Sequence, residues 1–272
     1  MFGKNQITGQ KYFNNADDKL LITSIFLTLQ GEGPFRGMPA VFVRFAKCNL
    51  QCGWCDTFFD ARDWLTVEQI QNKIDELIDK QYNNTDKSDI VLVVTGGEPM
   101  LQKNIVDLLE WGNKYFYATQ IESNGTLLQD IPKQTYLVVS PKCLERKGKP
   151  IKYLEIPEKV KERADCFKFV MSADQSSPYS SIPDYALNSE KQVFVSPMNI
   201  YNKEPEKAKQ LRSQKNDITL EQRSTTDEVI SFWEPGLLDM TANQKNHEYT
   251  AQYCLEHKLI FNMQLHLFAS LA

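Results

Sequence analysis

The order of apolar and amphipathic segments predicts an α/β fold, in which a mainly parallel sheet, open or curved into a barrel, is covered by helices. Two observations support this prediction. Strand-like apolar runs alternate with helical or turn-rich stretches, and several runs are continuously apolar, as in strands buried on both faces. Short motifs rich in Gly, Cys or charged residues follow these runs directly, and in such folds chemistry takes place at the carboxyl ends of the strands.

Each expected element rests on its local pattern. Strands are expected at residues 20–29 and 39–46, which are apolar and β-branched and are separated by a turn-rich segment. A helix is expected over residues 66–81, because apolar residues recur at helical spacing and Thr66 with Gln69 forms a capping-box pattern. A strand at 90–94 and a helix at about 101–111 follow. Further strands are expected at residues 116–121, 136–139, 166–170, 193–195 and 259–265.

Composition limits the function classes. Of the 272 residues, 42% are hydrophobic and 24% charged, as is typical of a globular protein, and the net charge of −4 argues against stable nucleic-acid binding. No apolar run approaches the roughly 18 residues of a membrane span, and the first twenty residues lack a signal-peptide core, so we expect a cytoplasmic protein without membrane attachment. We expect a single domain over residues 1–272, with an N-terminal extension at about 1–20 and an inserted polar excursion at about 200–242.

Three of the six cysteines, Cys48, Cys52 and Cys55, form a C-x3-C-x2-C cluster directly after an expected strand. Reducing conditions favour metal binding over disulfides for such a cluster. Its spacing can ligate three irons of a [4Fe–4S] cluster and leave the fourth iron open. A structural zinc site needs four ligands, and no His is close in the sequence, so zinc is the weaker alternative. The other cysteines are expected to be buried small hydrophobic residues: Cys143, Cys166 and Cys254.

The segment Cys48-Asn-Leu-Gln-Cys-Gly-Trp-Cys55 resembles the cluster loop of radical S-adenosylmethionine (SAM) enzymes. With it, the chain resembles the 7-carboxy-7-deazaguanine synthase family in a further set of motifs: Leu29-Gln-Gly-Glu-Gly33, Cys55-Asp-Thr57, Thr95-Gly-Gly-Glu-Pro99, Glu122-Ser-Asn-Gly-Thr126, Ser140-Pro-Lys142, Ser196-Pro-Met198 and Met263-Gln-Leu-His266. It departs from the family pattern at Ser196, where Gln is usual, and at Leu265, where Thr is common. The resemblance implies a partial, incomplete TIM-like barrel of radical SAM type, with parallel strands inside and helices outside.

The resemblance also implies an activity. A carbon–nitrogen lyase would convert 6-carboxy-5,6,7,8-tetrahydropterin to 7-carboxy-7-deazaguanine with release of ammonia, in the biosynthesis of queuosine and other 7-deazapurines. The implied cofactors are a [4Fe–4S] cluster, SAM and Mg²⁺, and the implied partners are a flavodoxin or ferredoxin as electron donor and a second copy of the chain in a homodimer. Two alternatives stay open, namely a radical SAM activase that generates a glycyl radical and a non-catalytic zinc-binding module.

The same resemblance assigns roles to individual residues. The implied SAM contacts are Trp54, Cys55, Asp56, Gly97, Ser140, Pro141 and Lys142, and the implied substrate contacts are Leu29, Gln30, Gly31, Arg44 and Thr95. Thr57 is the implied Mg²⁺ ligand, although Asp56 is the harder ligand by chemistry alone. Glu122 is expected to be an acid/base or a substrate-anchoring group.

Two cations can also be judged from their local sequence. Arg44 lies on an apolar strand, where a charge must face a partner or solvent, and a guanidinium matches a substrate carboxylate. Lys142 could instead be an ordinary surface lysine. The basic stretch at 147–152 is expected to be a solvated loop and no phosphate site, because its lysines surround Gly148 and Pro150.

Overall fold

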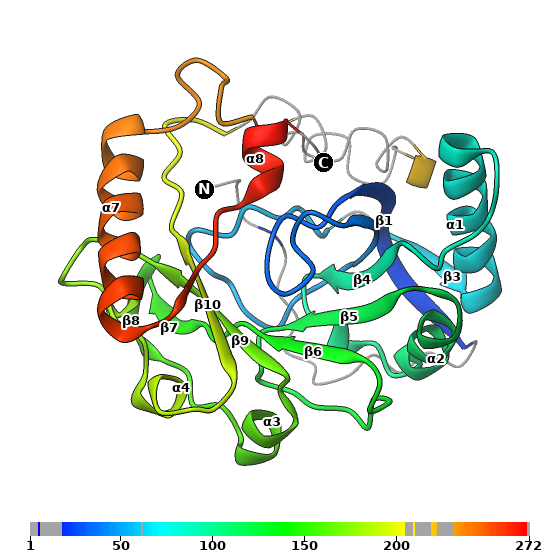
Figure 1. Cartoon of the computed structure of the whole chain (residues 1–272), viewed down its shortest axis with the longest axis horizontal. Coiled ribbons are helices and arrows are strands. Elements are labelled where there is room, and N and C mark those ends of the chain that lie inside the picture. The colour runs from blue at the N-terminus through cyan, green and yellow to red at the C-terminus, as the bar shows by residue number, and fades with distance from the viewer. Residues whose placement is uncertain are drawn as a thin grey trace.

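The computed structural model describes residues 5, 18–60, 62–204, 209, 219–221 and 231–270. A nine-stranded sheet is strongly curved, and most of the helices lie around its outside (Figure 1). The strand order is β11-β10-β9-β6-β5-β4-β2-β1-β3. The strands are β1 (Lys19–Leu29), β2 (Pro39–Phe45), β3 (Asp63–Thr66), β4 (Val91–Gly96), β5 (Ala118–Ser123), β6 (Tyr136–Val139), β9 (Cys166–Met171), β10 (Gln192–Pro197) and β11 (Ile260–Phe261). The predicted α/β fold is confirmed.

The helices alternate with the strands along much of the chain. They are α1 (Val67–Tyr82), α2 (Ile105–Tyr115), α3 (Glu158–Arg163), α4 (Asp184–Leu187), α7 (Met240–His257) and α8 (Leu265–Ala269), with the short 3-10 turns η1 (Pro99–Leu101) and η2 (Pro178–Ser180). Strands β7 (Cys143–Arg146) and β8 (Lys149–Tyr153) form a separate antiparallel hairpin. Among the described residues, no helix is both long and apolar enough to cross a membrane.

Seven neighbouring strands, from β2 to β11, pair in parallel, whereas β1 is antiparallel to both β2 and β3. The exception has a simple cause. Only residues 30–38 connect β1 to β2, and a parallel pair needs a crossover of a dozen or more residues. As a result, Leu29 at the end of β1 pairs with Pro39 at the start of β2.

Side chains alternate between the two faces of the curved sheet. The outward face is apolar and packs against the helices, and together they form the main hydrophobic core. Val43, Val94 and Phe169 of the strands belong to this core, as do Ile70 and Ile74 of α1. Other residues of the same strands line the interior. There, apolar residues fill one end, in a cluster that includes Ala40, Val91, Val93, Phe35 and Phe42, and polar residues occupy the rest.

The capping box predicted for α1 is confirmed. The backbone N–H of Gln69 donates to Thr66 Oγ1 at 3.2 Å, and the backbone N–H of Thr66 donates to Gln69 Oε1 at 2.9 Å. The helix predicted at 101–111 begins later, at Ile105, because Glu98 caps the 3-10 turn η1 through the N–H of Met100. The strand predicted at 259–265 covers only two residues before α8 begins.

The two expected surface segments lie largely outside the described residues. The structure does not describe residues 1–4 and 6–17 of the N-terminal extension, nor residues 205–208, 210–218 and 222–230 of the excursion. The last part of the excursion is attached to the body, because Leu237 and Leu238 are buried against Leu267. The domain boundaries stay a prediction.

Candidate functional site

A cavity of about 690 Å³ lies inside the curved sheet and extends to the loop that carries the cysteine cluster. Most of the predicted site residues line it: Leu29, Gln30, Arg44, Cys48, Cys52, Trp54, Cys55, Asp56, Thr57, Thr95, Gly97, Glu122, Ser140 and Lys142. Gly31 and Pro141 are not among the lining residues. Gly31 instead packs against His266, so that an added Cβ would lie 2.3 Å from His266 Nδ1. The structure therefore brings the predicted residues together, and their individual roles stay predictions.

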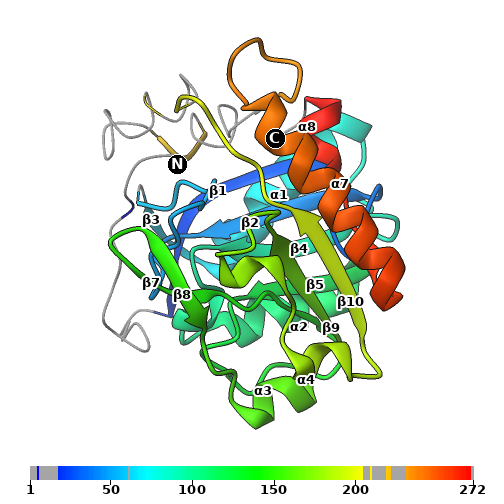
Figure 2. The ribbon, with the colours of Figure 1, turned by 90° about the vertical axis from the view of Figure 1, so that its left-hand side faces the viewer.

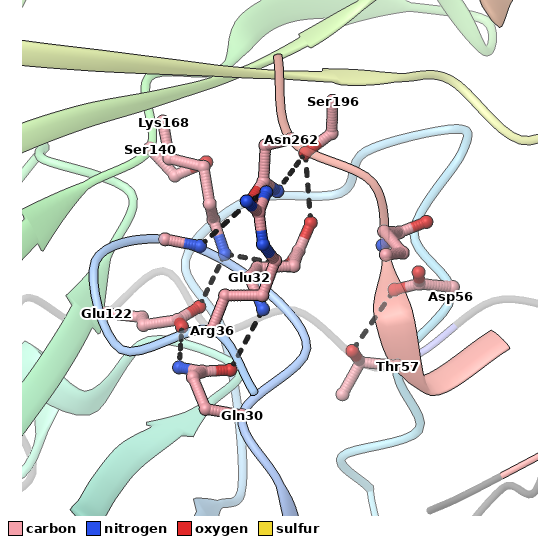
Figure 3. Close-up of polar contacts among 12 residues, drawn as sticks. Gln30, Glu32, Arg36, Asp56, Thr57, Glu122, Ser140, Lys168, Ser196 and Asn262 are labelled. Carbon is pink, nitrogen blue, oxygen red and sulfur yellow. Dashed lines mark hydrogen bonds and ion pairs between the residues drawn. The ribbon is translucent and has the colours of Figure 1, made fainter. Parts of the chain in front are cut away.

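A buried ammonium group, that of Lys168 on β9, lies on the inner side of the sheet among carboxylates and amides (Figure 3). Lys168 Nζ is 2.9 Å from Glu32 Oε2 and 2.7 Å from Glu122 Oε2, and the residue is only 7% exposed. Burial lowers the pKa of Lys168, but the two carboxylates outweigh it and raise that pKa above its usual value. Burial likewise raises the pKa of Glu32, but Lys168 and His266 lower it to about 2. Lys168 and Glu32 are therefore both charged at neutral pH.

Neutral donors fix the remaining oxygens of the two carboxylates. Glu122 Oε1 accepts from Gln30 Nε2 at 3.3 Å and from Gln120 Nε2 at 2.8 Å. Glu32 Oε1 accepts from Ser196 Oγ at 3.1 Å, and that hydroxyl accepts from Asn262 Nδ2 at 2.8 Å. Ser196, a departure from the family pattern, thus belongs to this network.

The expectation that every motif lies at the carboxyl edge of the sheet is wrong for residues 30–33. Because β1 is antiparallel to β2, these residues leave the sheet beside Pro39, at the opposite edge. They reach the cavity because the loop turns into the barrel, where Glu32 pairs with Lys168 and the N–H of Gly33 donates to Asn262 Oδ1 at 3.0 Å. The loop is closed by backbone hydrogen bonds between Gln30 and Met38, and from Gly37 to Gln30.

The cysteine loop begins directly after β2. Cys48 is 8% exposed, and its Sγ accepts from the N–H of Leu50 at 3.4 Å and from Asn124 Nδ2 at 3.9 Å. All three cysteines of the cluster are free thiols. Burial raises the pKa of Cys48 to about 12 and that of Cys52 to about 11, and it also raises the pKa of Cys55. A metal must therefore displace protons from buried thiols when it binds.

The donor set fits a [4Fe–4S] cluster better than a single metal ion. The three cysteines line one cavity, and the spacing C-x3-C-x2-C supplies three thiolates, one fewer than the four ligands of a structural zinc site. A cubane cluster binds each thiolate on a different iron, which spreads its ligands apart. Residues Cys48, Cys52 and Cys55 would hold three of the irons.

The glycines of the Thr95-Gly-Gly-Glu-Pro99 motif permit a close approach between protein backbones. A Cβ on Gly97 would lie 1.9 Å from Lys47 O, and one on Gly96, which has a φ of +131°, would lie 2.2 Å from Phe45 O. The N–H of Gly97 donates to Phe45 O at 3.0 Å and that of Glu98 to Lys47 O at 2.8 Å. The end of β4 is thereby fixed against the first residues of the cysteine loop.

Glu98 joins the end of β4 to the end of β5. It is fully buried and accepts from the N–H of Met100 at 3.0 Å, from Ser123 Oγ at 2.8 Å and from the N–H of Asn124 at 2.7 Å. The side chain of Asn124 then donates to Asn49 Oδ1 at 2.9 Å and to Cys48 Sγ. Glu98 therefore positions a residue that contacts a cluster cysteine.

Two other predicted groups have defined contacts at the cavity. Thr57 Oγ1 donates to Asp56 Oδ1 at 3.3 Å, which places the two candidate Mg²⁺ ligands side by side (Figure 3). Lys142 Nζ donates to Ser140 O at 2.9 Å and lies 5.2 Å from the centre of the Trp54 ring. Burial lowers the pKa of Lys142, so this residue is no ordinary surface lysine.

Sequence reasoning missed several residues of the site, most clearly Lys168, Glu32 and Asn262. A signal for Lys168 was present, because it interrupts an apolar strand in the same way as Arg44 does. Glu32 lies within a motif that was singled out for its neighbours. Asn262 gave no local signal, since it follows a two-residue strand and its partners Gly33 and Ser196 lie far from it in the sequence.

Glu98 should give the apo protein a distinctive pH dependence. Burial raises the pKa of Glu98 from 4.5 to about 7, so the folded state binds more protons than the unfolded state between these values. As the pH rises from 5 to 7, the unfolding free energy of the wild type should therefore fall, relative to that of Glu98→Gln, by about 1 kcal/mol per pH unit. Urea denaturation across this range measures it, and parallel curves for the two proteins would contradict the assignment.

Known proteins resemble the chain in sequence and in fold. Residues 29–148 match a family described as a 4Fe-4S single cluster domain. The 7-carboxy-7-deazaguanine synthase of Rickettsia prowazekii is 34% identical over 221 residues, which cover 81% of this chain and 87% of that protein. The protein of the same name from Rhodospirillum rubrum is 35% identical over 188 residues, which cover 67% of this chain and 71% of that protein.

The fold agrees with these matches. The crystal structure of QueE from Escherichia coli superimposes with a TM-score of 0.55 at 22% identity, covering 91% of this chain and 94% of that chain. This likeness shows a shared fold. The matches do not favour a glycyl-radical activase or a zinc module. Sequence similarity over four fifths of its length shows that this chain belongs to the 7-carboxy-7-deazaguanine synthase family.

Proposed function

We propose that the chain is a radical SAM lyase that contracts the ring of 6-carboxy-5,6,7,8-tetrahydropterin to 7-carboxy-7-deazaguanine and releases ammonia, in queuosine biosynthesis. One observation carries the proposal. A three-cysteine loop and a set of charged and amide side chains line the same cavity, so a cluster-bound cofactor and a polar substrate would meet inside it. The family membership supports the same reaction, because the relatives carry the name of this synthase.

The cofactors would occupy the outer part of the cavity. Cys48, Cys52 and Cys55 would hold the [4Fe–4S] cluster through three of its irons, and the iron without a protein ligand would be available to SAM. Together, the bound cluster and SAM supply one-electron chemistry that yields a hydrogen-abstracting radical. The proposed SAM contacts remain Trp54, Cys55, Asp56, Gly97, Ser140, Pro141 and Lys142, most of which line the cavity.

The substrate would occupy the inner part of the cavity. Arg44 lines this region and lies 5.4 Å from the Phe26 ring, where its guanidinium can receive the substrate carboxylate. Glu122 is held by an ammonium on one oxygen and by two amides on the other. This geometry favours substrate anchoring over proton transfer for Glu122. The proposed further contacts are Leu29, Gln30, Gly31 and Thr95.

We further propose that Mg²⁺ binds through Thr57, that a flavodoxin or ferredoxin supplies the electron, and that the enzyme is a cytoplasmic homodimer. The Mg²⁺ proposal is supported by a hydroxyl and a carboxylate, Thr57 and Asp56, that lie side by side at the cavity. Mg²⁺ takes few protein ligands and keeps several waters or substrate oxygens, so one hydroxyl is a sufficient anchor.

The activity test is anaerobic incubation of the reconstituted protein with the carboxypterin, SAM, Mg²⁺ and a reductant. We expect 7-carboxy-7-deazaguanine and ammonia, detected by mass, in amounts well above the SAM consumed, because SAM is regenerated in this family. Cys52→Ala should abolish the cluster and the product, whereas Cys254→Ala, a buried cysteine of the α7 core, should retain both. Absence of product from wild-type protein with a full cluster would refute the proposed function.

Thr57 should affect the response to Mg²⁺ and leave the cluster unchanged. Thr57→Ala is expected to keep iron content and absorbance, yet to lose at least about tenfold in turnover together with Mg²⁺ stimulation, because a misplaced substrate loses its reactive alignment. Thr57→Ser keeps the oxygen and should retain most of both. Activity is measured against Mg²⁺ concentration. A wild-type Mg²⁺ response in Thr57→Ala would place the ion elsewhere, with Asp56 as the next candidate.

A further inference from the structure

The basic stretch expected to be a solvated loop is an ordered β-hairpin. Strands β7 and β8 pair from Cys143 with Tyr153 to Arg146 with Lys149, apart from the nine-stranded sheet. Figure 2 shows the hairpin at the edge of the molecule. Its two turn residues, Lys147 and Gly148, have φ values of 53° and 74°, as a tight turn between twisted strands requires. The hairpin is therefore a regular element of secondary structure at this surface.

The hairpin contacts the cysteine loop directly. The backbone N–H of Gly53, the residue after Cys52, donates to Glu145 Oε2 at 2.7 Å. A Cβ on Gly53 would lie 2.9 Å from that oxygen and 3.2 Å from Gly148 O. Lys147 and Gly148 also line the cavity that contains the cysteines. The hairpin thus separates the loop that would hold the cluster from the surface on this side.

The outer surface of the hairpin is cationic and partly apolar. Residues 142–152 contain five Lys or Arg and one carboxylate, in a chain of net charge −4. The carboxylate, Glu145, points to Gly53, and four of the cations are exposed: Arg146, Lys147, Lys149 and Lys152. Leu144 and Ile151 are 42% and 48% exposed. Exposed apolar side chains within a rim of cations are typical of a recognition surface for an acidic protein.

We infer that the β7–β8 hairpin is the docking surface for a small acidic electron-carrier protein. This inference rests on the proposed function, in which one electron from outside the chain must first reduce the cluster. In the docked complex the reduced carrier loses one electron and the cluster gains it, passing from the 2+ to the 1+ state, with no proton transferred. Charge complementarity selects the carrier, and the contact between Glu145 and Gly53 brings its docking site next to the cluster loop.

The test compares two reductants on the enzyme with its cluster bound. Reduced flavodoxin is the acidic probe, and reduced methyl viologen is a small cation that needs no protein docking site. The variant is Lys149→Glu with Lys152→Glu, two exposed lysines of β8 that are not among the cavity-lining residues, and the matched control is Lys114→Glu with Lys159→Glu, two exposed lysines of α2 and α3. Stopped-flow absorbance follows cluster reduction, and calorimetry follows flavodoxin binding.

With flavodoxin at low salt, the hairpin variant should be reduced at least about tenfold more slowly and bind more weakly, and high salt should remove the difference. With methyl viologen it should be reduced at least as fast as the wild type, and the control should match the wild type with both reductants. Should the Glu variant lose iron, the Lys149→Gln and Lys152→Gln pair replaces it, with a smaller expected effect of the same sign.

Three results would overturn the inference. They are a hairpin variant reduced by flavodoxin at the wild-type rate, a control variant slowed equally, and single-stranded DNA bound as tightly as flavodoxin, which would show an unspecific anion surface. The proposed function is judged separately, by product formation with methyl viologen. Failure of the wild type to form product with this reductant would refute the function and leave the docking result intact.

Discussion

The buried ammonium group of Lys168 is the constraint on which the inner site depends. An unpaired charge inside a protein is very costly, so the barrel must supply carboxylates around it. Glu122 comes from the neighbouring part of the sheet, but Glu32 comes from the loop after β1, which leaves the sheet at the opposite edge. The ion pair therefore draws that loop into the barrel. Gln30, at the start of the same loop, donates to Glu122. Ser196 donates to Glu32 and accepts from Asn262.

A second constraint fixes the cysteine loop relative to this inner site. Gly96 and Gly97 let the end of β4 touch the backbone after β2, and Glu98 ties the same point to the end of β5. Asn124 extends this contact to Cys48. One cavity therefore has two regions formed by residues that are distant in sequence. The inner region contains the charged groups of Lys168, Glu32 and Glu122, and the outer region contains the three thiols. This division matches a polar substrate beside a soft metal cluster.

Much of the fold and of the site could be predicted from local pattern. Continuous apolar runs indicated parallel strands, Thr66 and Gln69 fixed the start of α1, and the cysteine spacing indicated the metal. The direction of β1 was missed because motifs were placed by the strand they follow, without regard to the short connection to β2. Lys168 was missed because its partners lie far away in sequence, and the hairpin because lysines around Gly and Pro are equally common in open loops.

The most direct test of this account is hydrogen–deuterium exchange of apo Lys168→Met, with exposed Lys159→Met as the control. Loss of the ammonium leaves the carboxylates of Glu32 and Glu122, each only 16% exposed, without their cation, and breaking a buried ion pair in this way typically costs about 3 kcal/mol or more. We predict faster exchange at the amides of Gln30 and Gly37, which close the loop, and unchanged protection in β5 and β6. Wild-type protection throughout residues 30–38 would contradict the claim that this ion pair holds the loop inside the barrel.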